Sequence, residues 1–265
     1  YMIARMIEED MLEPLNFDNI PNFADIDPNL LNPAYDPENL YSVPYMWGLL
    51  GVIYNKTMVD EEDLGSWDLM WNEKYADDIL MFDNSRDAIG IGLKRLGYSY
   101  NTTDETQIKE AVDLLIEQKP LVQAYVMDEV FGKMEGGNAA VGTYYYGDYL
   151  TMAENNPDLG FYIPEEGTNT YVDAMCILKG AKNKENAEAF INYMCSTEAG
   201  LKNCEEIWYS TPLMSVREEL DPEIANDPYA YPDEEIMAKC ESYAGLPQNI
   251  LDLYDSEWTR LKSAT

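Results

Sequence analysis

Two segments of the sequence place aromatic rings directly beside a carboxylate. The first is the run Val-Gly-Thr-Tyr-Tyr-Tyr-Gly-Asp that ends at Asp148, and the second is Tyr-Val-Asp, which ends at Asp173. The face of an aromatic ring attracts a cation, and a carboxylate accepts charge-assisted hydrogen bonds from N–H donors. These side chains together predict a site that holds a small organic cation between rings and acids.

The elements that carry these segments alternate along the chain. Short apolar runs of strand length are followed by segments with the helical spacing of apolar residues. The clearest helix is predicted over 104–118, with an apolar face that includes Ile108 and Leu115. The predicted strands are 49–54, 79–82, 121–126, 139–145, 159–163 and 173–178. Such alternation is typical of an α/β protein with mostly parallel sheets.

The predicted strand ends place polar segments where a ligand would bind. In open α/β sheets, ligands bind beyond the carboxyl ends of the strands. The loop 83–87 follows the strand 79–82, and the corner 144–148 ends the strand 139–145. Asp173 is expected to begin the strand 173–178, as a carboxylate at the head of an apolar run.

Composition argues against several classes of function. The 265 residues include 17 Lys and Arg against 50 Asp and Glu, a formal net charge of −33. Such a charge repels nucleic acid and anionic membrane surfaces, so we expect no nucleic-acid partner. Its simplest explanation is solubility, with attraction of a cationic ligand as a secondary benefit.

The residue types that most often hold metals or act as catalytic bases are scarce. The absence of histidine excludes Ser-His-Asp and Cys-His catalysis and leaves no imidazole for a metal. The four cysteines lack the short spacing of a zinc or thioredoxin-type motif. We therefore expect neither a metal nor another cofactor.

The start of the sequence and its apolar runs indicate where in the cell the protein could be located. No run of 18 apolar residues is present, so no membrane-spanning helix is expected. The sequence starts at Tyr1 within what reads as the middle of an element, which is typical of a mature or truncated chain. The absence of a signal peptide is therefore no evidence for the cytoplasm.

A series of short motifs runs in order through nearly the whole chain. One is Tyr-Ser-Val-Pro-Tyr-Met-Trp-Gly at 41–48, which leads into the apolar run 49–54. Others are Ser66-Trp67, Leu-Lys-Arg-Leu-Gly-Tyr-Ser at 93–99, Asn-Thr-Thr-Asp at 101–104, Met-Glu-Gly at 134–136, Tyr-Val-Asp at 171–173, Tyr-Ser-Thr-Pro at 209–212 and Tyr-Pro-Asp at 231–233. In order and spacing, the motifs resemble those of spermidine/putrescine-binding proteins, the solute receptors of polyamine ABC importers.

The resemblance implies a type II periplasmic-binding-protein fold, in which two α/β lobes joined by crossing strands close over a ligand. The first lobe would hold 1–48 and 174–219, and the second would hold 49–173 and 220–265. The family carries a further N-terminal α/β portion before the position of Tyr1. We therefore expect the first lobe to be incomplete, which would remove some of the aromatic residues that contact the ligand.

The resemblance also assigns seven ligand-binding positions. They are Tyr1, Asn84, Asp87, Tyr145, Tyr171, Asp173 and Tyr209. Asp173 falls on the aspartate expected to bind an inner amine of the ligand. Asn84 and Asp87 fall on two acidic positions of a loop that holds another amine. Tyr145 and Tyr171 fall on tryptophans of the family.

Several of these positions depart from the family pattern. Asn84 supplies a neutral amide instead of a charge, and tyrosine replaces tryptophan twice. The segment Ser-Tyr-Ala at 242–244 stands where the family has a glutamine, so that contact is expected to be missing. Fewer acids and smaller rings predict an altered preference among polyamines.

The resemblance implies a receptor and not an enzyme. It would bind putrescine or spermidine, close about hinge strands near Gly48 and Ala174, and present the closed form to an ABC permease in the membrane. We expect a monomer outside the cytoplasm, either in the periplasm or at the cell surface as a lipid-anchored protein.

The sequence pattern alone leaves simpler roles open for the same residues. Asp173 would serve as a cap or turn residue at a strand start, and Asp87 as an acid favoured by a helix N-terminus. Tyr145 and Tyr171 would be half-buried strand aromatics.

Other functions also remain open. The same fold could bind another small organic cation or an unrelated solute such as a sugar. An enzyme that uses paired carboxylates among rings, such as a glycosidase, is a second alternative. A structural or adhesive surface protein without a ligand is a third.

Overall fold

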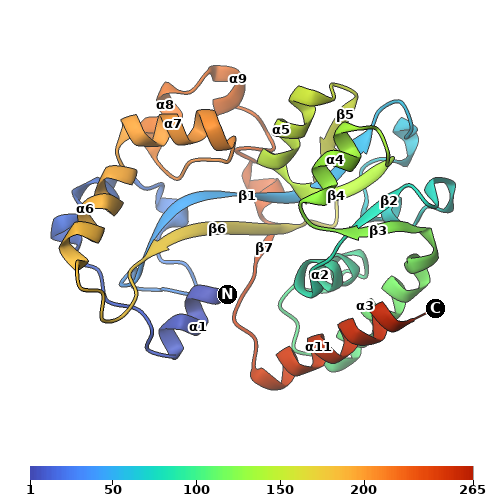
Figure 1. Ribbon diagram of the computed structural model, residues 1–265, viewed down its shortest axis with the longest axis horizontal. Helices are drawn as coiled ribbons and strands as arrows, with labels where there is room; N and C mark the ends of the chain where they lie inside the picture. Colours follow the sequence, from blue (N-terminus) through green and yellow to red (C-terminus); the bar gives the residue numbers. More distant parts are fainter. Residues whose placement is uncertain (265) are drawn as a thin grey trace. The chain divides into compact units, whose positions relative to one another are not determined.

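Strand β1 (Ser42–Asn55) carries residues of both units into which the chain divides (Figure 1). The computed structural model describes residues 1–264. Unit 1 contains Tyr1–Gly48 and Tyr171–Tyr231, and unit 2 contains Leu49–Thr170 and the segment from Pro232 onward. The chain passes between the units within β1, within β6 (Asn169–Cys176), and after Tyr231.

The lobes expected from the sequence stay a prediction. The expected division between residues 48 and 49 coincides with the division of the units inside β1. The compact units differ from the expected lobes elsewhere, because residues 171–173 and 220–231 belong to unit 1.

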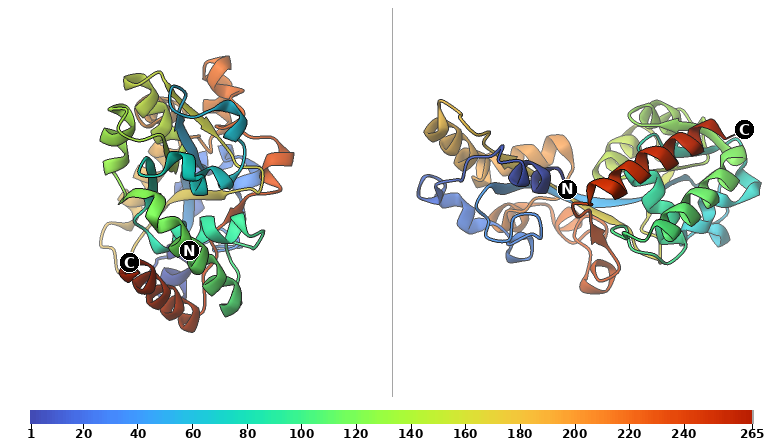
Figure 2. Two further views of the ribbon diagram at one scale, coloured as in Figure 1. Left: turned by 90° about the vertical axis from the view of Figure 1, so that its right-hand side faces the viewer. Right: turned by 90° about the horizontal axis from the view of Figure 1, so that it is seen from below.

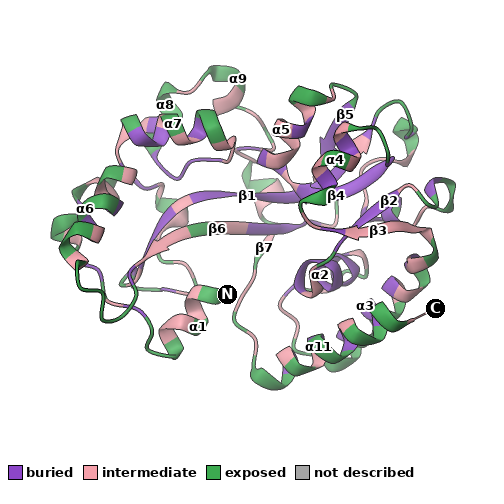
Figure 3. Cartoon of the chain, in the orientation of Figure 1, coloured by how far each residue is buried: buried purple, intermediate pink, exposed green. Residues whose placement is uncertain are grey.

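Unit 2 is built around strands that are largely buried (Figure 3). The strands are β2 (Ile79–Phe82), β3 (Val122–Val126), β4 (Val141–Tyr145) and β5 (Leu159–Tyr162). The predicted strand 79–82 coincides with β2, 49–54 lies inside the longer β1, and the predictions for β3, β4 and β5 differ by one or two residues at an end. The helices between them are α2 (Ser85–Arg95), α3 (Glu105–Gln118), α4 (Glu129–Glu135) and α5 (Tyr146–Asn155). This alternation confirms the predicted α/β class.

The strands are mixed in direction, so the expectation of mostly parallel sheets is wrong for β1. The order is β3-β2-β4-β1-β6-β7, and β5 also pairs with β1. β2 is parallel to β3 and β4, because α-helices connect these strands. β1 is antiparallel to β4 and β5, with Leu50 opposite Tyr145 and Val52 opposite Tyr162. Only short 3-10 turns join β1 to β2, so no crossover helix imposes a parallel arrangement.

The helices of unit 2 follow the predicted apolar pattern. The α3 residues Ile108 and Leu115 are fully buried, and Asp104 caps the helix by accepting a hydrogen bond from the backbone N–H of Thr106 at 2.8 Å. Helix α11 (Gln248–Ser263) packs against α3 and α2 (Figure 2). No helix within residues 1–264 is long and apolar enough to cross a membrane.

Unit 1 surrounds a core of its own. Its α-helices are α1 (Met2–Glu8), α6 (Lys184–Met194), α7 (Thr197–Ile207), α8 (Met214–Glu219) and α9 (Pro222–Ala225). The core includes Ile20 and Ile26 from the loops before β1, Val43 and Met46 from β1 itself, and Val216 from α8. The Pro-punctuated segment before β1 forms short 3-10 turns, because Asn16 and Asp27 cap two of them and proline starts two of them.

A buried carboxylate fixes the start of β1. Asp36 is 3% exposed and accepts hydrogen bonds from the backbone N–H groups of residues 40, 41 and 42 at 2.9–3.0 Å. It also accepts a bond from the hydroxyl of Ser42 at 2.8 Å. Four donors on one carboxylate offset the cost of burying its charge.

Strand β6 begins earlier than the sequence suggests. A two-residue strand, β7 (Glu241–Ser242), pairs in parallel with Asn169 and Thr170 and extends β6 at its beginning. Asp173 therefore lies in the middle of β6, and the expectation that it begins a strand is wrong. The partner strand comes from the end of the chain, so no local pattern could indicate it.

Candidate ligand-binding site

Two of the predicted rings meet in unit 1. The ring of Tyr171 on β6 lies edge-on to that of Tyr209, with centroids 5.5 Å apart. Gly48 of β1 leaves the space that Tyr171 fills, since a Cβ there would come within 2.5 Å of the tyrosine hydroxyl oxygen. A side chain at residue 48 would therefore displace this ring.

The position of Tyr209 follows from how α7 ends. Trp208 adopts a left-handed backbone with φ of 63°, which ends the helix and redirects the chain. Ser210 then exchanges two backbone hydrogen bonds with Trp47 of β1, at 3.0 and 3.2 Å. The loop that carries Tyr209 is thereby fixed to the strand that carries Gly48.

Asp173 provides a carboxylate on the same face of β6 as Tyr171, because the two residues are two apart in a strand. It is exposed, and its carboxylate forms no hydrogen bond or ion pair with any residue of the described part of the chain. Neighbouring groups nevertheless displace part of its water, which raises the pKa of Asp173. An ammonium group would remove this penalty by pairing with the charge.

Two further tyrosines lie within electrostatic reach of Asp173. Burial is the main cause that raises the pKa of Tyr35 to about 12, and the charge of Asp173 adds to it. The pKa of Tyr45 on β1 is raised by burial first and also by Asp173. Tyr45 was not among the predicted site residues. Its place in the aromatic 41–48 motif is the sequence feature that could have indicated it.

Tyr1, the remaining predicted residue of unit 1, is 51% exposed and directly precedes α1. Its backbone carbonyl accepts a hydrogen bond from the N–H of Arg5 at 3.2 Å. Its ligand contact stays a prediction.

Tyr145 of unit 2 stands at the edge that the sequence predicts. It is the last residue of β4, and its ring lies 5.8 Å from that of Phe82, the last residue of β2, between centroids. It also lies 5.1 Å from the ring of Tyr144, whose hydroxyl donates to Asp128 at 3.0 Å. The carboxyl ends of two parallel strands therefore meet in an aromatic cluster.

Asn84 and Asp87 stand at the N-terminus of α2, close to this edge. Asn84 caps the helix, because its Oδ1 accepts hydrogen bonds from the backbone N–H groups of Arg86 at 2.9 Å and Asp87 at 3.4 Å. Asp87 lies in the first helical turn and is 4% exposed. Asp87 thus stands in the helix N-terminal position that the sequence left open for it, and the contact of both residues with a ligand stays a prediction.

The Asp87 carboxylate has a partner that the sequence did not indicate. The hydroxyl of Tyr243 lies 2.9 Å from its Oδ1 and 3.1 Å from the carbonyl oxygen of Arg86. Burial raises the pKa of Asp87 to about 6, although the bond to Tyr243 and the charge of Arg86 act in the opposite direction. Tyr243 is the middle residue of the Ser-Tyr-Ala segment. From the sequence, we expected of this segment only that it lacks the glutamine contact of the family.

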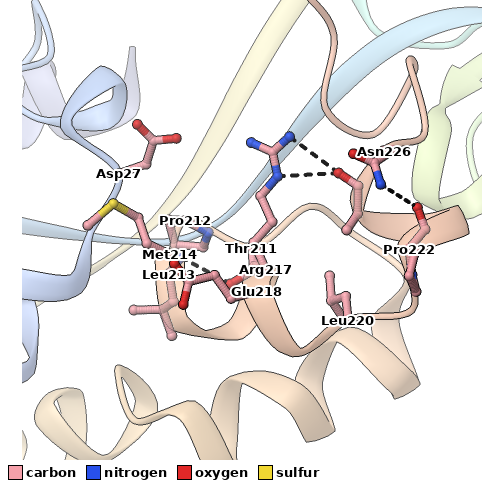
Figure 4. Close-up of a pocket in the computed structure, with 11 residues that line it drawn as sticks. Asp27, Thr211, Pro212, Leu213, Met214, Arg217, Glu218, Leu220, Pro222 and Asn226 are labelled. Atoms are coloured by element: carbon pink, nitrogen blue, oxygen red, sulfur yellow. Dashed lines mark hydrogen bonds between the residues drawn. The ribbon is translucent and has the colours of Figure 1, made fainter.

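A cavity of about 500 Å³ lies elsewhere in unit 1 (Figure 4). It is lined mostly by residues of the segment 211–226, together with Asp27. The guanidinium of Arg217 donates to the carbonyl oxygen of Ala225 at 3.3 Å and lies 4.1 Å from the centroid of the Tyr231 ring. None of the seven predicted residues is among those that line this cavity.

Residues 1–264 contain no group of three or more Cys, Asp or Glu side chains arranged to hold a metal ion. What the site residues offer is rings, hydroxyls and one unpaired carboxylate. Such groups bind and orient a solute. Two α/β units that carry rings and a carboxylate on their strands are the arrangement expected of a solute-binding protein.

The chain belongs to the family of bacterial extracellular solute-binding proteins, whose family model matches residues 1–240. A spermidine/putrescine-binding periplasmic protein of Salmonella typhimurium is 33% identical over 241 residues, which cover 91% of this chain and 69% of the relative. SpuD of Pseudomonas aeruginosa, a putrescine-binding periplasmic protein, is 27% identical over 98% of this chain and 76% of its own length.

A solved structure gives the same result for the fold. It is the substrate-binding protein PotD of a spermidine/putrescine ABC transporter from Streptococcus pneumoniae, with a TM-score of 0.90 and 40% identity. The match covers 99% of this chain and 81% of that chain. The predicted type II periplasmic-binding-protein fold and the predicted family are both confirmed.

Family membership decides two further questions. The family consists of solute-binding proteins, so this protein is a receptor and not an enzyme, and the glycosidase alternative is not supported. The family is also extracellular, in agreement with the expected location outside the cytoplasm.

Proposed function

We propose that this protein is the polyamine receptor of an ABC importer and binds putrescine or spermidine. The observation that carries the proposal is Asp173, an exposed carboxylate without a partner, on the same face of β6 as Tyr171. The named relatives bind putrescine or spermidine, and they match more than nine-tenths of this chain.

Each side-chain type has a part in this function. Asp173 would pair with an ammonium group, which relieves the cost of its own partial loss of water. Tyr171 and Tyr209 would place ring faces against the ammonium groups and methylenes, with a cation–π contribution of about 0.5–2 kcal/mol per ring. The net charge of −33 would draw the cation toward the protein.

The proposal includes a membrane partner. A receptor of this kind delivers its ligand to a permease, and the protein would act as a monomer that presents its liganded form. The polypeptide carries out no chemical step, because binding and release alone suffice for delivery.

Calorimetric titration and thermal unfolding with three matched compounds test the proposal. They are putrescine, spermidine and 1,4-butanediol, which has the carbon chain of putrescine without its charges. We expect at least one amine to bind and to raise the melting temperature by mass action, and the diol to do neither. If neither amine binds at millimolar concentration, or if the diol binds equally well, the polyamine assignment is wrong.

A further inference from the structure

The cavity in unit 1 has the size and the lining of a small-molecule site. Its volume of about 500 Å³ lies within the range of about 300–1,000 Å³ that ligand pockets have. Leu213 and Leu220 belong to its apolar wall, whereas Asp27, Arg217 and Glu218 bring charge to it (Figure 4). An apolar wall with a few polar groups is the usual composition of a site that binds an organic molecule.

Backbone contacts fix the wall of the cavity. Ile26 and Leu213 form an antiparallel bridge, and the N–H of Asp27 donates to the carbonyl oxygen of Pro212 at 2.8 Å. Asp27 is therefore tied to the residues directly before α8, the helix that carries the other two charges. All lining residues belong to unit 1, so the cavity lies within one compact unit.

Arg217 brings a positive charge that is held in place but not neutralised. Its guanidinium lies 4.1 Å from the centroid of the Tyr231 ring, and its Nε and Nη2 both donate to the carbonyl oxygen of Ala225 at 3.3 Å. Its Nη1 donates to no residue within 1–264, and no carboxylate in that range forms an ion pair with it. A guanidinium with a free N–H edge is suited to receive the carboxylate of a ligand.

The two carboxylates of the cavity also have no ion-pair partner within the described residues. Glu218 is exposed and forms no hydrogen bond there. Asp27 accepts one hydrogen bond, from the N–H of Asn29 to its Oδ1 at 2.9 Å. One positive and two negative groups thus line the same cavity, and none of them neutralises another by direct contact.

These charges indicate which ligand fits. A simple anion would be repelled by Asp27, by Glu218 and by the net charge of −33. A simple cation would leave Arg217 without a partner. A molecule with one carboxylate and two ammonium groups matches all three charges, and an aliphatic chain between these groups would contact the apolar wall.

We propose that the cavity is a second binding site of this protein and takes a basic amino acid. The ligand carboxylate binds to Arg217, its two ammonium groups bind to Asp27 and Glu218, and its methylenes lie along Leu213 and Leu220. This inference goes beyond the proposed polyamine function, because putrescine and spermidine have no carboxylate for Arg217.

Calorimetric titration with L-ornithine tests the inference, because ornithine is putrescine with one added carboxylate. Ornithine is titrated into the free protein and into protein saturated with putrescine. We expect a dissociation constant of about 1 mM or less in both titrations. Absence of binding to the free protein overturns the inference. Loss of binding after saturation with putrescine also overturns it, because ornithine would then occupy the polyamine site.

The same titrations keep the two proposals apart. If putrescine does not bind, the polyamine function is wrong, while binding of ornithine still supports the second site. If putrescine binds and ornithine does not, the polyamine function stands and the second site is wrong.

A change of one exposed acid makes the test specific to the cavity. Glu218→Gln removes a charge at nearly constant size, and Glu218 has no partner within residues 1–264 whose loss would affect folding. We expect ornithine to bind about fivefold more weakly, the effect of one partly exposed ion pair. The matched control is Glu219→Gln, because Glu219 is the next residue and exposed but does not line the cavity. Equal effects of the two variants overturn the inference.

Arg217→Gln tests the group that recognises the ligand carboxylate. We expect it to weaken ornithine binding at least about tenfold and to leave putrescine binding unchanged. The control is Arg95→Gln, because Arg95 also lies over a ring, that of Trp71 at 4.4 Å, but is paired with Asp68 at 2.7 Å in unit 2. If Arg217→Gln lowers the melting temperature and leaves ornithine binding unchanged, Arg217 serves only to hold Ala225 and Tyr231, and the inference is wrong.

Discussion

Tyr171 occupies the space above Gly48 so closely that a Cβ at residue 48 would come within 2.5 Å of its hydroxyl oxygen. The ring reaches Tyr209 only because β1 has no side chain at this position. Gly48 is therefore a positioning residue for the aromatic part of the proposed site in unit 1.

Gly48→Ala tests this relationship. The new methyl group must push the Tyr171 ring aside, so we expect the affinity for the preferred amine to fall about tenfold, as calorimetric titration would measure. Gly132→Ala is the control, because no atom lies within 4 Å of the position of its Cβ and alanine favours the helix there. Unchanged affinity in Gly48→Ala would show that the ring does not contact the ligand.

The Asp173 carboxylate should be important for binding and unimportant for folding. Asp173→Asn removes the charge that pairs with the ammonium, and we expect affinity to fall about a hundredfold, or about 2.7 kcal/mol. Because the carboxylate has no partner within residues 1–264 and its pKa is raised, thermal stability should stay equal or rise slightly. Asp18→Asn, at another exposed position of unit 1, should leave affinity unchanged. A parallel loss of stability and affinity would contradict this role.

Asp87 should make the folded protein less stable as the pH rises. Burial raises the pKa of Asp87 in the folded protein to about 6, from an ordinary value of 3.8. The protonated carboxyl is favoured by folding, so its contribution to the free energy of unfolding is fully present below pH 3.8. This contribution is lost as the pH rises through about 6. Asp87→Asn should remove this loss and stabilise the protein by up to about 3 kcal/mol at pH 7.5, with little effect at pH 4.

Denaturant unfolding at both pH values measures the effect as a difference from the wild-type chain. That difference cancels the titration of the other acidic residues. Glu105→Gln is the control, since Glu105 lies in the first turn of α3 but is exposed. Equal effects of Asp87→Asn at the two pH values would show that the carboxylate does not change its protonation over this range.

Asp36 should be one of the most important single side chains for the stability of unit 1. Asp36→Ala leaves three backbone N–H groups and the Ser42 hydroxyl without this acceptor, so we expect a loss of about 3 kcal/mol in denaturant unfolding. Asp27→Ala removes a single capping bond, to the N–H of Asn29, and should cost about 1 kcal/mol. Similar losses in the two variants would contradict the special role of Asp36.

The acidic surface should increase the rate at which a cationic amine associates with the protein. Raising the salt concentration from 0.01 to 0.15 M shortens the screening length from about 30 Å to about 8 Å. We expect the association rate of the preferred amine to fall on the order of tenfold over this range, as stopped-flow fluorescence of the tyrosines and tryptophans would measure. A rate that does not depend on salt would show that the charge of −33 serves solubility alone.

The sequence by itself determined the fold class, most element positions and the family. Helix 104–118 and the strands 79–82 and 139–145 were predictable because their apolar spacing and capping residues are local signals. The motif order was sufficient for the family, because short segments in fixed sequence carry the resemblance without any knowledge of contacts.

Tertiary structure alone decided how the charged residues are used. Asp87 and Tyr243 are 156 residues apart in the sequence, so no local pattern joins them, yet the hydroxyl of Tyr243 donates a hydrogen bond to the Asp87 carboxylate. The pairing of β7 with Asn169 and Thr170 likewise places Asp173 in the middle of a strand. Burial and partnership depend on segments that meet only in the folded chain, and they determine which of the acids still carries an unpaired charge.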